Sequence, residues 1–176
     1  SCGIGPVALG HLSEWVREAT AVVNSVTVDS TGDKYNRKTY TLTAGDATID
    51  LSSKNLGSAD VALLTAWMQR PEVTASLTSL RCGSNPGMVG ELDSRGRVKT
   101  PDVHIEALQQ LLDALKPSAV TDLDISDIGI GPTGADRVAD YIRDAKASIA
   151  SLKLDSNGIF GELWDSGNVK EADKFV

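Results

Sequence analysis

The chain has 176 residues but only two cysteines and two histidines, and this scarcity excludes several kinds of site. Two cysteines cannot form a disulfide framework, and neither residue type occurs at the spacing of a zinc site. His11 and His104 stand in no motif spacing to a serine, cysteine or carboxylate, and no P-loop or nucleophile elbow is present. We therefore expect no catalytic residues, no metal site and no cofactor.

Long apolar runs and an excess of positive charge are also missing. No stretch of eighteen apolar residues can form a membrane-spanning helix, and no signal segment stands at the start. Ser1 is compatible with removal of an initiator methionine or of a longer leader. The formal net charge of −7 disfavours nucleic acid and anionic membranes, which attract basic surfaces, but suits a basic protein partner. We expect a soluble protein without membrane insertion, with an intracellular location favoured.

What the sequence does contain is a repeat of itself. Residues 79–85 (SLRCGSN) return 72 residues later as residues 151–157 (SLKLDSN), and residues 49–52 (IDLS) resemble residues 123–126 (LDIS). With one residue deleted, the match continues from Gly90, Glu91, Leu92, Val98, Lys99 and Asp102 to Gly161, Glu162, Leu163, Val169, Lys170 and Asp173. A unit of alternating strand and helix has therefore been duplicated in tandem.

The same short apolar-x-apolar strand occurs twice in each copy. Spacings of 31, 43 and 29 residues separate the second apolar positions of successive strands, which are Leu51, Cys82, Ile125 and Leu154. A polar insert at residues 89–101 explains the long spacing, so the underlying period is about thirty residues. Such a period is typical of solenoids, because one strand and helix cannot bury their apolar face without neighbours.

Three segments resemble the leucine-rich repeat signature, namely Leu77-x-x-Leu80-x-Cys82-x-x-Asn85, Leu152-x-Leu154-x-x-Asn157-x-Ile159 and Leu123-x-Ile125. The resemblance is to the helix-containing, ribonuclease-inhibitor-like subtype and covers residues 45–176. Its last loop, Asn157-x-Ile159-x-Gly161-x-Leu163, is similar to plant-type repeats. In this family an asparagine bonds backbone amides as the chain leaves the strand. Asn85 and Asn157 hold that position, whereas Lys54 and Ile128 stand there in the other two repeats, beside Asn55 and Asp127 as substitutes.

The resemblance implies an α/β leucine-rich repeat solenoid, a short right-handed arc with a parallel sheet on its concave side and helices outside. We expect a cap in residues 1–44 and an array of about four repeats in residues 45–176, the last one incomplete. Alternation in residues 26–29 and 38–43 predicts a hairpin in the cap. A helix is predicted there by apolar residues at helical spacing, which are Leu9, Leu12, Val16, Ala19 and Val23.

Start signals for the repeat helices are Ser58, Thr100-Pro101-Asp102 and Thr133. Each helix is expected to be amphipathic with one buried side. The second helix shows this best in its stripe of Leu108, Leu111, Leu112 and Leu115. Cys82 occupies an inward strand position and is expected to be a buried thiol.

A competing hypothesis concerns Gly129-x-Gly131-x-x-Gly134, which follows a predicted strand and opens a helix. Together with Asp155 it has the spacing of a dinucleotide-binding motif, in which a pyrophosphate lies at a helix N-terminus. The loop after the first strand, residues 55–60, lacks these glycines although its flanking elements match. The same glycines also fit the ordinary strand-to-helix loop of the helix-containing repeats, so dinucleotide binding is a remote alternative.

We therefore predict a protein interaction module or scaffold without catalytic activity. The alternatives are a structural subunit of a larger assembly and a regulator of an enzyme, since helix-containing members include ribonuclease inhibitors and GTPase-activating proteins. The unfinished last repeat predicts that a partner or further chain covers the C-terminal edge. By strand alternation the binding face is predicted to consist of Asp50, Ser52, Arg81, Asp122, Asp124, Ser126, Lys153 and Asp155, with Ser79, Gly83 and Ser151 beside them. Aspartates outnumber cations on this face, which favours a basic partner segment.

Overall fold

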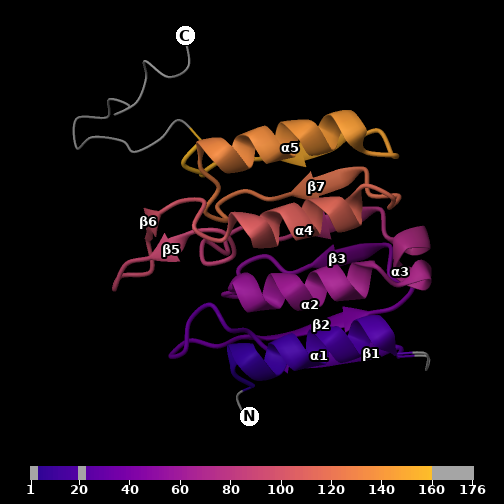
Figure 1. The fold of residues 1–176 in the computed structure, drawn as a ribbon, viewed down its shortest axis with the longest axis horizontal. Coiled ribbons are helices and arrows are strands. Elements are labelled where there is room, and N and C mark those ends of the chain that lie inside the picture. Colours follow the sequence, from indigo (N-terminus) through magenta and orange to yellow (C-terminus); the bar gives the residue numbers. More distant parts are fainter. Residues whose placement is uncertain (1–3, 20–22, 160–176) are drawn as a thin grey trace.

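The computed structural model describes residues 4–19 and 23–159, which form a mixed α/β structure of five helices and eight strands (Figure 1). Within these residues no helix is long and apolar enough to cross a membrane. The elements in chain order are α1 (Pro6–Glu18), β1 (Ser25–Asp29), β2 (Thr39–Thr43), β3 (Thr48–Asp50), α2 (Ser58–Met68), α3 (Pro71–Ser76), β4 (Ser79–Arg81), β5 (Glu91–Leu92), β6 (Val98–Thr100), α4 (Ile105–Leu115), β7 (Asp122–Asp124), α5 (Pro132–Asp144) and β8 (Ser151–Lys153).

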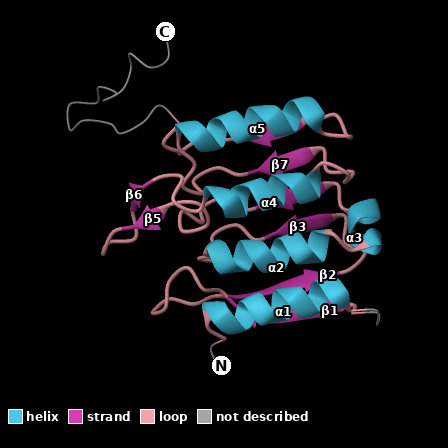
Figure 2. Cartoon of the chain, in the orientation of Figure 1, coloured by secondary structure: helices cyan, strands magenta, loops and turns pink. Residues whose placement is uncertain are grey.

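The four short strands of the repeating units form one parallel sheet in the order β3-β4-β7-β8. Their register is unshifted, because Ile49 pairs with Leu80, Leu80 with Leu123, and Leu123 with Leu152. The strands expected at Leu80 and Leu152 are thus confirmed. Helices α1, α2, α4 and α5 lie on one side of the strands (Figure 2). Equivalent residues of successive units therefore stack in straight rows across the sheet.

The rows that face the helices form the core. Leu80 and Leu123 are fully buried, and so are Cys82 and Ile125 in the next row. Burial raises the pKa of the Cys82 thiol to about 12, so this cysteine is a buried thiol as expected. The alternation of apolar and polar residues in these strands is what separates the core from the opposite face.

The helices differ from the sequence prediction in three places. Helix α1 ends at Glu18, before Val23. Helix α4 begins at Ile105 rather than next to Asp102, whose side chain bonds another helix. Helix α2 is buried on almost every side instead of one, because it lies between α1 and α4 and packs against both. Eight of its eleven residues are apolar, which suits such a central position.

Two antiparallel strand pairs stand outside the parallel sheet. The predicted hairpin is confirmed as β1 and β2, and the polar insert forms the pair β5 and β6 beside the stack (Figure 1). The buried carboxylate of Asp60 fastens the hairpin to α2. It accepts hydrogen bonds from the backbone and hydroxyl of Thr31, from the hydroxyl of Tyr40 and from the backbone of Gly57. Burial and the Asp60 carboxylate both raise the pKa of Tyr40, which keeps its donated proton.

Candidate functional site

The face of the parallel sheet that the helices leave uncovered carries the predicted binding residues. Asp50, Arg81, Asp124 and Lys153 form one row in register across the sheet. Parallel sheets are normally covered on both faces because their strands are apolar on both sides. Here every second residue is polar or charged, so the sheet tolerates one face in water. The structure brings the predicted residues together on that face.

Charges alternate along this row from strand to strand. Neighbouring strands lie about 4.8 Å apart, a distance at which opposite charges on the same face attract each other. Lys153 Nζ lies 3.4 Å from Asp124 Oδ2, and Arg81 Nη2 lies 3.4 Å from Asp122 Oδ2 in the neighbouring row. The cations of the sheet face therefore form ion pairs with aspartates of the same face.

Serine hydroxyls complete the bonding of the two central aspartates. Ser79 Oγ donates to Asp122 Oδ2 over 2.8 Å, and this bond, with others from Ser151 and Arg81, lowers the pKa of Asp122. Ser126 donates to Asp124 Oδ1 from its hydroxyl and its backbone N–H over 2.6 and 3.1 Å. Partial burial raises the pKa of Asp124, but the bonds from Ser126 and Lys153 outweigh burial and the net shift is downward. Both groups are held as carboxylates.

Exposure decides which charges a partner can reach, and it removes the excess of aspartates over cations that the simple count gives. The Asp122 and Asp124 side chains are 31% and 13% exposed, whereas those of Arg81 and Lys153 are 47% and 58% exposed. Ser79, predicted beside this face, is only 8% exposed and lies beside Asp122 in register. The accessible surface is therefore less acidic than its aspartate count indicates.

The remaining predicted residues lie at the ends of the strands. Asp50 is exposed and accepts a hydrogen bond from the backbone of Ser52, which lowers its pKa. Asp155 is also exposed, and Ser52 and Ser126 are partly buried. Gly83 is buried, and a side chain there would press against Ser126 Oγ and the Asp124 carboxylate at 2.8 and 3.0 Å. Asp50 and Asp155 are thus the exposed acids at opposite sides of the face.

The two signature asparagines bond the backbone as the resemblance implies. Asn85 Oδ1 accepts from Leu56 N over 3.0 Å, and Asn157 Oδ1 accepts from Ile128 N and Ile130 N over 3.0 and 3.1 Å. The substitute at the Lys54 position is not used, because Asn55 donates outward to the carbonyl of Asn36. The asparagine ladder therefore occupies alternate units in the described residues.

The glycine loop of the competing hypothesis is filled by the protein itself. Asp102 Oδ1 accepts from Gly131 N over 2.8 Å, and Asp102 Oδ2 accepts from Gly134 N over 3.1 Å. A Cβ atom at Gly131 or Gly134 would lie 2.7 or 2.6 Å from this carboxylate, so a side chain at either position would displace the Asp102 carboxylate. Asp102 thus occupies the place at the start of α5 where a phosphate group lies in dinucleotide sites. The glycines have a structural cause that the sequence did not reveal.

The backbone conformation explains the glycine at position 129, because its φ of +88° is one that glycine adopts without strain. A Cβ atom there would also lie very close to the backbone nitrogen of Gly90.

Among the residues described, no three histidine, cysteine or acidic side chains are grouped to hold a metal ion. No protein family matches the sequence, and a search of curated proteins finds no match.

Proposed function

We propose that the chain is a leucine-rich repeat protein of the helix-containing subtype and serves as a protein interaction module or scaffold without catalytic activity. The observation that carries this proposal is the open, polar face of an all-parallel sheet. A repeat array offers such a face as an extended rigid surface. Stacked strands in register and the buried bonds of Asn85 support the family assignment.

The partner of this face is a polypeptide segment that is basic in net charge but not uniformly basic. Asp50 and Asp155 are exposed at its two sides and attract cations, while Arg81 and Lys153 between them reject a uniformly basic sequence. No aromatic side chain stands among the predicted face residues to anchor an apolar partner. Exposed ion pairs contribute about 0 to 1 kcal/mol each, so binding through this face is weak and salt-sensitive.

A structural subunit is the second candidate function. Leu152 in the last strand and Leu154 directly after it are only partly buried, whereas Leu123 in the neighbouring strand and Ile125 directly after that strand are fully buried. Partly exposed apolar residues at the end of a repeat array favour an assembly in which another element covers them. Regulation of an enzyme is the third candidate function, and none of the described residues supports it specifically.

An array of immobilised peptides of different net charge tests the interaction role. Asp122 and Asp124 bond neighbouring strands, so the variant changes the outer acids instead, as Asp50→Lys with Asp155→Lys. A matched variant, Glu106→Lys with Asp136→Lys, makes the same charge change on exposed positions of α4 and α5. We expect the wild type and the matched variant to bind basic peptides and the face variant to lose at least about tenfold in affinity. Equal binding by all three proteins refutes the assignment of the face.

A further inference from the structure

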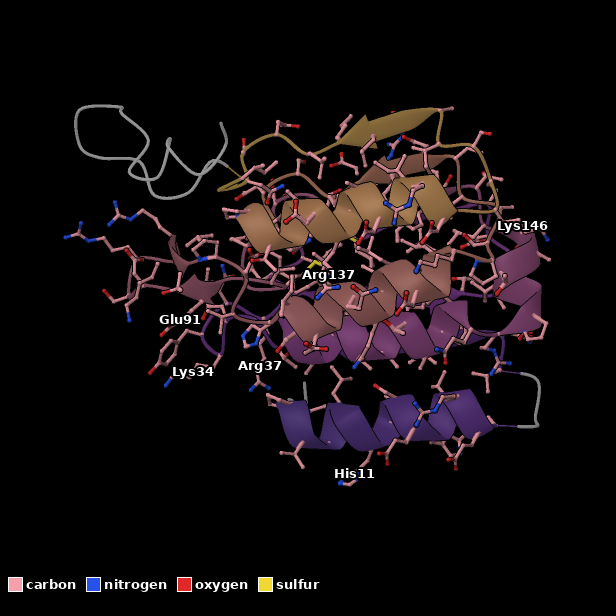
Figure 3. The ribbon with its side chains drawn as sticks, turned by 45° about the horizontal axis from the view of Figure 1, so that its top comes forward. His11, Lys34, Arg37, Glu91, Arg137 and Lys146 are labelled. Carbon is pink, nitrogen blue, oxygen red and sulfur yellow. The ribbon has the colours of Figure 1, made fainter. Side chains whose placement is uncertain are left out.

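Two arms project from the edge of the parallel sheet at which its strands end. The first is the β1–β2 loop, residues 30–38, and the second is the β5–β6 hairpin, residues 91–100. Their bases face each other across a groove of about 320 Å³, with Thr31 and Gly32 on one side and Glu91 and Leu92 on the other. Figure 3 shows Lys34, Arg37 and Glu91 at this same end of the molecule.

The arms have the opposite charge to the rest of the protein. They contain six basic and three acidic residues, a formal charge of +3 in a chain whose formal net charge is −7, so the remaining residues carry −10. The basic residues are Lys34, Arg37, Lys38, Arg95, Arg97 and Lys99. The acidic residues are Asp33, Glu91 and Asp93. Local positive charge in an acidic protein attracts an anionic group to one place on its surface.

Two of the three arginines in the arms are available to a ligand. Arg97 and Lys99 form ion pairs with Asp93 and Glu91 inside the hairpin. Arg37 and Arg95 are exposed, and neither has an ion-pair partner among the residues that the structure describes. One guanidinium without an ion-pair partner thus stands on each arm, and a guanidinium binds a carboxylate through two parallel hydrogen bonds.

Both arms are fixed in place at their bases. Gly32 N donates to Asn55 O over 3.0 Å, a contact so close that a Cβ atom at Gly32 would lie 2.5 Å from the same oxygen. The second arm is fastened where His104 N donates to Val89 O over 2.8 Å. Fixed arms lose little conformational entropy on binding.

Exposed apolar surface lies beside the cations. Tyr35 is 87% exposed at the tip of the first arm, and the Lys34 ammonium lies 4.7 Å from the centre of its ring. Val98 on the second arm is 37% exposed. Tyrosine is one of the residue types enriched among the residues that anchor protein partners.

From these observations we infer that the arms bind an acidic polypeptide segment, at a site separate from the sheet face. The charge favours anions, and Tyr35 and Val98 supply apolar contacts that suit a peptide. A nucleic acid is disfavoured, because its phosphates repeat along the whole backbone and those outside the arms would meet the acidic surface of the rest of the chain. The inference does not depend on binding at the sheet face.

Fluorescence anisotropy with a fluorescein-labelled peptide of eight glutamates tests the inference. The arm variant is Arg37→Glu with Arg95→Glu, and the matched variant is Arg137→Glu with Lys146→Glu, which changes two exposed cations outside the arms. We expect saturable binding by the wild type and the matched variant, weakened at high salt, and at least tenfold weaker binding by the arm variant. Absence of saturable binding at low salt, or equal loss in both variants, overturns the inference.

Two further measurements keep the outcomes separate. A labelled single-stranded DNA of eight nucleotides is titrated under the same conditions, and tighter binding of the DNA than of the peptide overturns the choice of partner. The neutral variant Arg37→Gln with Arg95→Gln is expected to bind the glutamate peptide with intermediate affinity. The sheet face is tested with basic peptides and changes at Asp50 and Asp155, so either site can fail without the other.

Discussion

The strands β7 and β8 have the same length and direction and pair in register, yet the apolar residues in and directly after them are buried to different depths. Leu123 and Ile125 are fully buried, whereas their counterparts Leu152 and Leu154 are partly exposed. β7 lies between two strands, and β8 has one neighbour in the described sheet. The repeated motif thus determines the local conformation, and the number of neighbours determines the stabilisation that each apolar residue contributes.

The asparagines show the same difference. Asn85 is fully buried and donates from Nδ2 to the carbonyls of Leu51, Cys82 and Gly83. Asn157 is partly buried and makes the equivalent bonds to Ile125 and Leu154. Water can replace a lost partner at the second site but not at the first, so equal bonds have unequal energetic value.

The largest expected difference between the strands comes from truncating one leucine in each. Leu123→Ala leaves a cavity in a closed part of the core and is expected to lower the free energy of unfolding by about 3 kcal/mol. Leu152→Ala, in the same row, is expected to cost about 1 kcal/mol because its side chain is already partly hydrated. Urea unfolding followed by circular dichroism measures both values. Equal costs would show that an element outside the described residues covers β8.

Removal of the asparagine side chains is expected to have the next largest effect. Asn85→Ala leaves Leu56 N and several carbonyls without partners in the core and is expected to cost about 3 kcal/mol. Asn157→Ala is expected to cost about 1 kcal/mol, because water reaches the freed groups. The same unfolding assay compares the variants. A larger cost at Asn157 would contradict the role of burial.

A smaller effect is expected at the link between the two copies, where Asp102 bonds the start of α5. Asp102→Ala removes both bonds and is expected to cost about 1 kcal/mol, as loss of an N-terminal cap does. Hydrogen exchange at the amides of Gly131 and Gly134 should become faster, while exchange in α2 stays unchanged.

Wild-type protein titrated with NAD is expected to show no saturable binding, because the Asp102 carboxylate fills the glycine loop. Micromolar affinity for NAD would contradict that explanation.

The smallest expected effect is the opposite response to pH of two aspartates near β7. The folded pKa of Asp122 is lowered by the hydroxyl of Ser79, so its stabilising contribution is complete above the unfolded pKa of about 3.9 and is lost as pH falls through the folded pKa. Burial and Asp155 raise the pKa of Asp127, so its contribution is present below about 3.9 and is lost as pH rises through the folded pKa. Carboxyl chemical shifts in an NMR titration give both midpoints. Coinciding midpoints would contradict the described bonds.

Much of the fold followed from the sequence because the repeat amplified weak local signals. The apolar-x-apolar strands recur with a common period, so the strands at Leu80 and Leu152 and the inward position of Cys82 were predictable. Helix α3 and the strand pair β5 and β6 were not predicted, because neither occurs in every unit. The last part of the second copy, from residue 160 onward, lies outside the described residues, and so do the predictions made for it.

Sequence alone determined which residues share the open face, because alternation in a strand fixes the side on which each side chain lies. Only the tertiary structure decided which of those charges a partner can reach. Stacking of the strands in register placed Asp122 and Asp124 beside donors from neighbouring units and left Arg81 and Lys153 more exposed. Pairing across strands depends on contacts between residues some thirty to forty positions apart, and a local pattern contains no information about those distances.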